Sequence, residues 1–350
     1  MLARLGRLLH PYPAAGPRAL APAVYADAQG HLVPASDRGF EGVACVDDAA
    51  RALVLYCDLW NATGAECARD CALGLLDFVL WMQEPDGRFL NFVRDWDGTR
   101  NLDGPTSFAG GSFWHARAVR GLAKAWTTFG GARVRAAIDR ALPYMETAGV
   151  NPDVGAVHVL AALDLAEDDA DGRLRSFIER RSDEIAGCRD GDVLANYPGE
   201  PLPHLWGHLQ EGVLAEASRY LGRADLLDAA RASAHALLEP VIQSSFALPR
   251  VEPYGVAAVV YGMDRLHQVT GSALYAELAA LARAWFDGRN AAGVPAYDRA
   301  AGAFRDGIDE GRLNPNSGAE SNIVGAQALL AEVAAWLTRD PRGCFPPRIT

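Results

Sequence analysis

The sequence predicts an all-α fold, an (α/α)6 toroid of six helical hairpins with short β-hairpins in its long rim connections. Three observations lead to this prediction. Apolar residues recur at three- and four-residue spacing in eleven successive segments. The links between these segments are alternately short and long. No alternating apolar pattern is long or frequent enough to build a sheet core. Helices joined in this way stack as antiparallel hairpins.

The eleven predicted helices follow one another along the chain at 46–60, 65–83, 112–129, 132–148, 153–166, 172–188, 204–221, 224–243, 253–270, 272–287 and 317–337. The odd helices begin about 54 residues apart on average, a period too long and too irregular for a solenoid repeat. We therefore expect a closed ring with the odd helices inside, where small residues such as Gly255 to Ala258 allow close packing.

The rest of the chain is assigned around this ring. Residues 1–45 form an N-terminal arm, 46–338 the toroid and 339–350 a C-terminal tail. A twelfth helix is missing at the C-terminus, and residues 2–10 are the candidate to close the ring. A short strand is expected at 88–93, and a small hairpin at 295–306 around Gly302.

Composition narrows the function classes. Half of the 350 residues are hydrophobic, which allows a sizeable core. The net charge of −11 argues against a nucleic-acid partner, because phosphate binding needs a basic surface. No apolar run approaches the ~18 residues of a membrane span, and the first ten residues lack the apolar stretch of a signal peptide. We therefore expect no membrane association.

The six cysteines contain no Cys-x-x-Cys pair, and most lie within apolar helical patterns. We expect all six to be reduced and the protein to be cytoplasmic. No Cys/His cluster has metal-ligand spacing, so no metal or other cofactor is expected. The one alternative is the face formed by His204, His208 and Glu211, on which no further ligand set converges.

In a ring of hairpins all inner helices begin at one rim, and the unusual polar and aromatic residues of this chain fall at those starts. They are Asp47, Asp48, Trp114, His115, His204, Trp206, His208, Glu211, Tyr254, Asn316 and Glu320, and Asp103 lies in a long link that leads to the same rim. Such a lining suits a sugar, whose faces stack on aromatic rings and whose hydroxyls pair with carboxylates, imidazoles and amides. The expected partner is an oligosaccharide or glycoside; the sequence gives no oligomeric state.

Carboxylates are the candidate catalysts, because cleaving a glycosidic bond takes one acid and one base or nucleophile. Glu320 is the first candidate, although it is also placed to form a capping box with Ser317. Asp48 and Asp47 follow. One of them is also placed to cap the helix and the other to pair with Arg51. We expect Asp47 to be held by Arg51 and Asp48 to face the pocket.

Three segments also give the chain a family resemblance. They are Glu41–Arg51, the link from Tyr297-Asp298 to Asp306-Gly307, and Asn314–Ser321. Together they resemble the six-hairpin glycosidase-like superfamily, in particular a poorly characterised bacterial group whose (α/α)6 modules sometimes lie beside glycosyltransferase domains. The resemblance covers roughly residues 38–337. It implies a toroid with its site at the rim and carboxylates as catalysts, and it does not fix the substrate.

The leading hypothesis is a glycoside hydrolase in which Glu320 works with Asp48 or Asp47. The other rim residues then bind substrate: Trp114, His115, His204, Trp206, His208, Glu211, Tyr254, Asn316 and Asp103. A sugar epimerase or isomerase that uses His204, His208 or His115 is the first alternative. A non-catalytic carbohydrate-binding module is the second.

Overall fold

The computed structural model describes residues 1–33, 41–168, 172–340 and 343–344. Its secondary structure is dominated by helices, and every strand in these residues is two or three residues long. The chain forms two compact units. The first comprises Met1–Ala148, Tyr297–Asp306 and Pro315–Thr350, and the second comprises Gly149–Ala296 and Gly307–Asn314. Each unit is described separately below.

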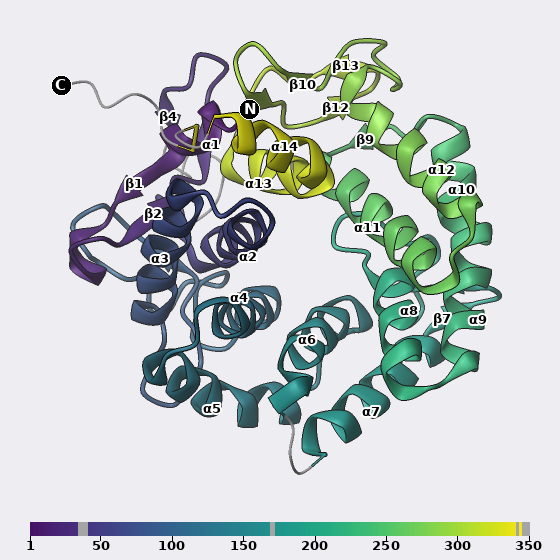
Figure 1. The fold of residues 1–350 in the computed structure, drawn as a ribbon, viewed down its shortest axis with the longest axis horizontal. Coiled ribbons are helices and arrows are strands. Elements are labelled where there is room, and N and C mark those ends of the chain that lie inside the picture. Colours follow the sequence, from purple (N-terminus) through teal and green to yellow (C-terminus); the bar gives the residue numbers. More distant parts are fainter. Residues whose placement is uncertain (34–40, 169–171, 341–342, 345–350) are drawn as a thin grey trace. The chain divides into compact units, whose positions relative to one another are not determined.

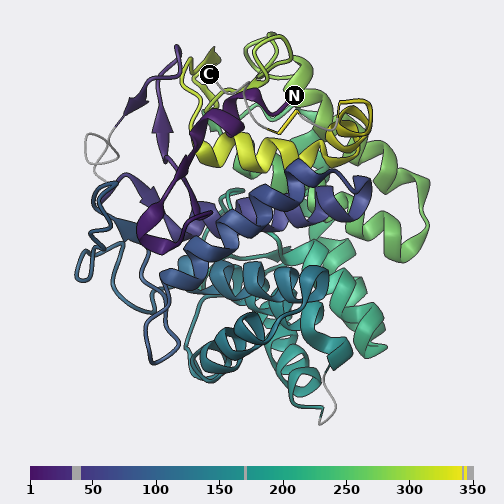
Figure 2. The ribbon, with the colours of Figure 1, turned by 60° about the vertical axis from the view of Figure 1, so that its left-hand side comes forward.

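Helical hairpins build the first unit (Figures 1 and 2). Its helices are α1 (Ala3–Leu8), α2 (Val46–Thr63), α3 (Glu66–Trp81), α4 (Phe113–Phe129), α5 (Ala132–Thr147), α13 (Ala319–Ala328) and α14 (Leu330–Arg339). Helix α2 packs on α3, α4 packs on α5, and α2 also contacts α4, α13 and α14. Small residues bring α2 and α4 together, because a Cβ added at Gly121 would lie only 3.2 Å from the Cβ of Ala50.

The predicted N-terminal arm is folded onto the first unit as short antiparallel pairs. These are β1 (Leu9–Pro11) with β2 (Leu20–Pro22), β3 (Tyr25–Ala26) with β4 (Leu32–Val33), and β5 (Ala44–Cys45) with β6 (Phe92–Val93). Helix α1 contacts α13; a ring-closing role for residues 2–10 stays a prediction. Residues 34–40 of the arm, and 341–342 and 345–350 of the predicted tail, lie outside the described residues.

The predicted hairpin around Gly302 is confirmed. Strand β10 (Tyr297–Asp298) pairs with β11 (Ala303–Phe304), with Tyr297 opposite Phe304. The rings of these two residues stack with centroids 4.1 Å apart. The strand expected at 88–93 shrinks to the two residues of β6.

The second unit has the same hairpin architecture (Figure 1). Its helices are α6 (Pro152–Leu165), α7 (Arg173–Gly187), α8 (Gln210–Leu221), α9 (Ala224–Ser233), α10 (Glu239–Gln243), α11 (Pro253–Thr270) and α12 (Ala273–Arg283). The pairs are α6 with α7, α8 with α9 and α11 with α12, and α8 also contacts α6 and α11. Its strands are β7 (Arg189–Asp190), β8 (Val193–Leu194), β9 (Arg250–Val251), β12 (Ile308–Asp309) and β13 (Arg312–Leu313).

Three predicted helices differ from the structure. The segment 224–243 contains a π-helical stretch, Ala234–Leu238, and the segment 317–337 is interrupted at Leu329. The helix expected at 204–221 begins only at Gln210. Gly207 has a φ of 72°, a left-handed conformation that no α-helix continues through. His204 and His208 therefore do not share one helical face, and that part of the prediction is wrong.

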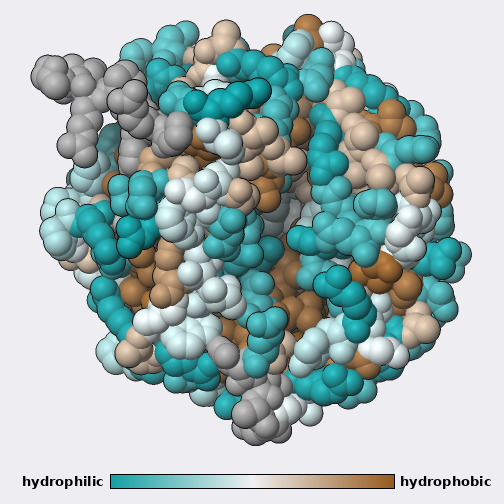
Figure 3. Space-filling model, viewed as in Figure 1, coloured by the Kyte–Doolittle hydropathy of each residue, from teal (hydrophilic) through white to brown (hydrophobic). Residues whose placement is uncertain are grey.

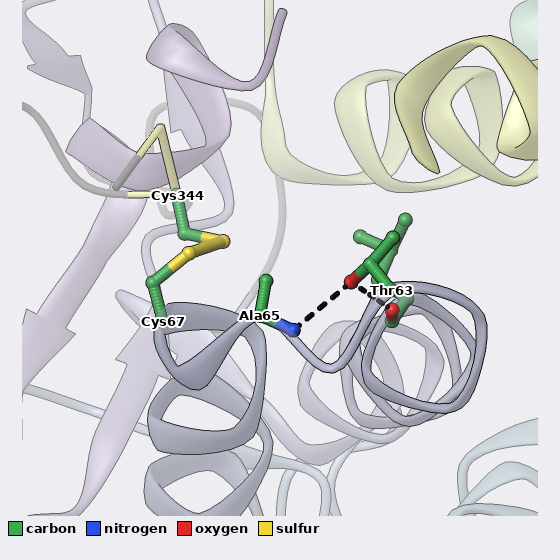
Figure 4. The surroundings of a disulfide bond; sticks show 5 residues. Thr63, Ala65, Cys67 and Cys344 are labelled. Carbon is green, nitrogen blue, oxygen red and sulfur yellow. Dashed lines mark hydrogen bonds between the residues drawn. A yellow bond between two sulfur atoms is a disulfide. The ribbon is translucent and has the colours of Figure 1, made fainter. Parts of the chain in front are cut away.

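The prediction that all six cysteines are reduced is also wrong. Cys67, at the start of α3, forms a disulfide with Cys344 (Figure 4). The bond lies beside the turn between α2 and α3, where the hydroxyl of Thr63 donates to the carbonyl of Leu59 and accepts from the N–H of Ala65. The two cysteines are 277 residues apart in the chain, so no local spacing pattern predicts the bond.

The surface shown in Figure 3 is mainly hydrophilic, with apolar residues in scattered patches. Within the described residues, no helix is both long and apolar enough to cross a membrane.

Candidate functional site

The start of α2 places two carboxylates at the edge of the first unit. Cys45 is the N-cap residue, and its Sγ accepts the N–H of Asp48 at 3.4 Å. The side-chain oxygen of Asn91 accepts the N–H of Asp47 at 3.2 Å. The expectation that an aspartate caps this helix is therefore wrong. With capping assigned to other groups, both carboxylates are left for other partners.

Arg51 is the centre of the cluster in the first unit. One terminal nitrogen of its guanidinium donates to Asp48 at 2.6 Å and the other donates to Glu320 at 2.6 Å. Asp47 lies farther away, at 3.7 Å. The structure thus brings the three predicted catalytic carboxylates together, from the starts of α2 and α13.

Asp47 has a different principal partner, Arg117 of α4, which donates to both of its oxygens at 2.6 and 2.5 Å. The Arg117 guanidinium also lies over the ring of Phe113, 4.4 Å from its centroid. The expected pairing of Asp47 with Arg51 is therefore present only as the weaker contact: Arg51 lies closer to Asp48, and Arg117 is the closer partner of Asp47. The reason is tertiary, because the cation that selects Asp47 comes from another helix.

The two aspartates differ in electrostatics as well. Burial raises the pKa of Asp48 to about 6, with further upward contributions from Glu320 and Asp47 and an opposing one from Arg51. Burial acts in the same direction on Asp47, but the charges of Arg117 and Arg51 outweigh it and hold the pKa of Asp47 below its usual value. The two adjacent carboxyl groups thus differ in protonation at mildly acidic pH, below the pKa of Asp48.

Glu320 is the most exposed of the three carboxylates, with 48% of its side chain accessible against 20% for Asp47 and 4% for Asp48. The alternative capping box with Ser317 is absent. Gly318 is the N-cap residue of α13, and the Ser317 hydroxyl accepts from the side chain of Asn322 instead. Glu320 is therefore free of a capping role and stands at the solvent edge of the cluster.

The spacing of Asp48 and Glu320 follows from their shared partner. Each is bonded at 2.6 Å to a terminal nitrogen of one guanidinium, and that group is planar and compact, so the two bonded oxygens lie within about 8 Å of each other. Pairs of catalytic carboxyl groups in glycosidases stand ~5–9.5 Å apart. The limit therefore admits both inverting and retaining geometry.

A second polar cluster lies at the start of α8 in the second unit. Its hub is Asn196, whose side-chain N–H groups donate to Glu200 at 3.2 Å and to the carbonyl of His204 at 2.9 Å. Its side-chain oxygen accepts from Gln210 at 2.8 Å and lies 2.8 Å from Nδ1 of His208. The backbone groups of His204 are engaged here, with its N–H bonded to Glu200, which explains why the helix begins later than predicted.

The contact with Asn196 also determines which ring nitrogen of His208 carries a hydrogen. Its Nδ1 must carry a hydrogen, because the facing oxygen of Asn196 is an acceptor. Its Nε2 lies 2.9 Å from Glu211 Oε1, which also accepts the hydroxyl of Ser233. The side chains of His208 and Glu211 are both buried, at 0% and 1% exposure.

His204 and Trp206 form the exposed part of this cluster. Their rings stack with centroids 3.9 Å apart, and Trp206 is 42% exposed. The carbonyl of Trp206 accepts from Nδ1 of His204 at 2.9 Å, which places the lone pair of the neutral imidazole on Nε2. That nitrogen is 3.9 Å from the nearer oxygen of Glu200, beyond hydrogen-bond reach.

The remaining predicted substrate-binding residues are distributed more widely. Trp114 donates its indole N–H to the carbonyls of Phe89 and Phe108. His115 is buried, and burial lowers its pKa to about 4. Asp103 is 85% exposed and pairs with Arg94. The partly buried Asn316 accepts the N–H of Asp306 through its backbone carbonyl, and Tyr254, also partly buried, lies at the start of α11. Their roles toward a substrate stay predictions.

Sequence reasoning did not assign a site role to Asn196, Glu200 or Asp306. Asn196 and Glu200 lie in a Pro-rich link that has the sequence of an ordinary loop, and the two hydrogen bonds that Asn196 donates to Glu200 appear only in the fold. The four-residue spacing of an amide and a carboxylate was the available signal. Among the described residues, no group of three or more His, Cys, Asp or Glu is arranged to hold a metal ion.

No protein-family model matches the chain, and neither does any curated protein. Solved structures do match over most of its length. A sugar epimerase from a ruminal bacterium has a TM-score of 0.70 at 12% identity, covering 89% of this chain and 92% of that one. A D-mannose isomerase has a TM-score of 0.71 at 12% identity, covering 95% of each chain. A GH76 α-mannanase from Bacteroides thetaiotaomicron has a TM-score of 0.66 at 11% identity, covering 96% and 94%.

These structures are carbohydrate-active enzymes, and they include hydrolases as well as epimerases and isomerases. At such low identity the likeness establishes the fold and not the reaction. It extends over nearly the whole of each chain, so the match covers the architecture and not a single hairpin. The likeness shows that the chain has an all-α (α/α)6 toroid fold, as the sequence predicts.

Proposed function

We propose that the protein is a glycoside hydrolase that acts on an oligosaccharide by carboxylate acid/base catalysis. The observation that carries this proposal is the cluster on Arg51, where Asp48 and Glu320 bind the same guanidinium from two different helices. Their separation of at most about 8 Å suits a pair of glycosidase carboxyl groups. The protein shares its fold with a GH76 α-mannanase.

The two carboxyl groups take different roles in this proposal. Glu320 is exposed and ion-paired with Arg51, so it is the group that reaches the substrate and acts as the base or nucleophile. Asp48, whose pKa is raised to about 6, carries its proton up to a higher pH than an ordinary aspartate and serves as the acid. Asp47, held ionised by Arg117, opposes the positive charge that develops on the sugar ring.

The test is release of reducing sugar from a panel of neutral oligosaccharides. Glu320→Gln and Asp48→Asn should each lower kcat by about 10²- to 10⁴-fold, the usual range for removing one acid/base group. Glu332→Gln is the control for Glu320, because Glu332 is similarly exposed and also paired with an arginine. Asp77→Asn is the control for Asp48, because Asp77 is a buried carboxylate bonded to two arginines. Both controls should retain activity.

A sugar epimerase or isomerase is the second candidate, favoured by His204. Its Nε2 is left as a basic nitrogen by the bond from Nδ1 to Trp206, which is the state that a proton-abstracting base requires. The exposed indole of Trp206 offers a face for a sugar ring. If this candidate holds, His204→Gln abolishes turnover, no reducing ends are released, and Glu320→Gln affects binding more than chemistry.

A carbohydrate-binding module without catalysis makes the opposite prediction. No variant then has turnover to lose, and sugar affinity survives Glu320→Gln. Turnover that disappears in Glu320→Gln, with the melting temperature unchanged, excludes this alternative.

A further inference from the structure

We propose that Asp306 is a positioning residue for the reaction: it fixes the first turn of α13 and thereby holds Glu320 against Arg51. This inference rests on the function proposed above, because it concerns the same carboxylate. Asp306 lies in the link between β11 and α13, within the first unit. It has no direct contact with a substrate in this proposal and acts through Glu320.

Two hydrogen bonds tie Asp306 to the start of α13. Its side-chain oxygen accepts the N–H of Gly318 at 2.7 Å. Its own N–H donates to the carbonyl of Asn316 at 2.9 Å. Gly318 is the N-cap residue, and Glu320 follows two residues later in the first helical turn. The carboxylate therefore sets the point at which the helix begins and the direction in which Glu320 leaves it.

The opposite side of this turn is fixed by the N-terminal arm. The carbonyl of Val24 accepts the N–H of Ala319 at 3.0 Å, and the carbonyl of Ala26 accepts the N–H of Ser317 at 3.3 Å. A Cβ on Gly318 would lie 2.9 Å from the Val24 carbonyl oxygen. Hydrogen bonds to the arm and to Asp306 together hold this turn.

Burial beside a second carboxylate distinguishes Asp306 from an ordinary cap. Burial raises the pKa of Asp306, and the nearby charge of Glu320 adds to this, while the Gly318 N–H, the Ser321 hydroxyl and Arg4 act against it. A buried carboxylate beside another carboxylate is costly for a cap on a helix of ten residues. An aspartate placed for helix stability alone has no need of this neighbour, whereas one that places Glu320 must be close to it.

Two variants separate the hydrogen bond from the charge. Asp306→Ala removes the acceptor, and Asp306→Asn keeps an acceptor oxygen of the same shape. The control is Asp298→Asn, because Asp298 lies in the same hairpin, accepts the N–H of Ala301 at 2.9 Å and pairs with Arg305. In the sugar-release assay, Asp306→Ala should lower kcat about 10- to 100-fold with KM nearly unchanged, as for a misplaced catalytic group.

Rescue by the conservative variant completes the kinetic test. Asp306→Asn should keep kcat within about threefold of the wild type, and Asp298→Asn should equal it. The proposal is overturned if Asp306→Ala keeps the wild-type kcat or changes KM alone. It is also overturned if Asp306→Asn loses as much as Asp306→Ala, because the charge and not the acceptor would then matter.

A measurement without substrate tests the positioning independently of the proposed function. ¹⁵N NMR of the arginine side chains reports rotation of the Arg51 guanidinium, which its ion pairs slow; the signals are assigned by their loss in Arg51→Lys. Asp306→Ala should speed this rotation, while Asp306→Asn and Asp298→Asn leave it unchanged. If the wild type has no hydrolytic activity, the proposed function is wrong, but the spectrum still tests the positioning role of Asp306. Unchanged Arg51 signals in Asp306→Ala overturn that role.

Discussion

Replacing Asp48 by asparagine should remove the activity and should make the protein progressively more stable, relative to the wild type, as the pH rises from 4 to 8. Asp48 is 2% exposed and bonded to Arg51, yet its pKa is raised from 3.8 to about 6. Folding therefore favours the protonated carboxyl. The stability gained from this preference is complete below pH ~4 and is lost as the pH rises through 6.

The magnitude follows from the size of the shift. A rise of about two pKa units corresponds to about 3 kcal/mol between the two protonation states. Asparagine does not titrate, so the free energy of unfolding of Asp48→Asn should gain up to about 3 kcal/mol on the wild type between pH 4 and pH 8. A constant offset from the altered bond to Arg51 does not affect this trend.

Urea unfolding of both proteins at five pH values from 4 to 8 measures the difference. Asp58→Asn is the control, because Asp58 lies on the same helix and pairs with Lys124, away from the Arg51 cluster. A stability difference that does not change with pH, or that favours the wild type as the pH rises, would refute the electrostatic account of Asp48. A gain that tracks pH supports a carboxyl group retained for its chemistry at a cost in stability.

Three further predictions concern stability. His115 is buried, and its pKa is lowered to about 4. The free energy of unfolding of the wild type, measured in urea, should therefore fall by about 3 kcal/mol relative to that of His115→Phe as the pH falls from 6.5 towards 4. Cys67→Ser should lower the free energy of unfolding by about 2–4 kcal/mol, because it removes the disulfide to Cys344. Dithiothreitol should lower the melting temperature of the wild type and leave that of the variant unchanged. Gly318→Ala should cost about 1–3 kcal/mol because its Cβ would meet the Val24 carbonyl, whereas Gly149→Ala, which meets nothing within 4 Å, should be nearly neutral in the same melt.

The helices could be predicted because their signal is local. The 3.6-residue period, and glycines such as Gly64 and Gly271 at the ends of α2 and α11, are readable in a single sequence. The start of α8 could not be predicted, because the bonds from Asn196 and Glu200 to the backbone of His204 depend on the folded loop. Tertiary hydrogen bonds there outweigh the apolar periodicity.

The candidate site was predictable in composition but not in pairing. The carboxylates Asp47, Asp48 and Glu320 stand out at helix starts, and the structure brings them together. The predicted pair of Asp47 with Arg51 is present at 3.7 Å, but the closer partner of Asp47 is Arg117 of α4, which a four-residue spacing on α2 does not reveal. Side-chain pairing across helices is set by packing, and a single sequence does not display it.

The disulfide is a second contact that the sequence pattern does not predict. Cysteines in apolar helical patterns usually are buried thiols, and Cys45, Cys57 and Cys71 are buried and outside any disulfide. Cys67 has the same kind of neighbours in the sequence, but the chain returns Cys344 to within 5.7 Å between Cα atoms. Local residue spacing does not predict a contact between residues that lie this far apart in the chain.

The most direct test of the central claim is one ¹H NMR experiment in D₂O with a panel of neutral oligosaccharides, comparing the wild type with Glu320→Gln and Glu332→Gln. The account predicts new reducing-end anomeric signals for the wild type and for Glu332→Gln, no deuterium at carbon, and no reaction for Glu320→Gln. Deuterium incorporated at a carbon next to the anomeric centre, without new reducing ends and with activity retained in Glu320→Gln, would contradict it and identify an epimerase or isomerase.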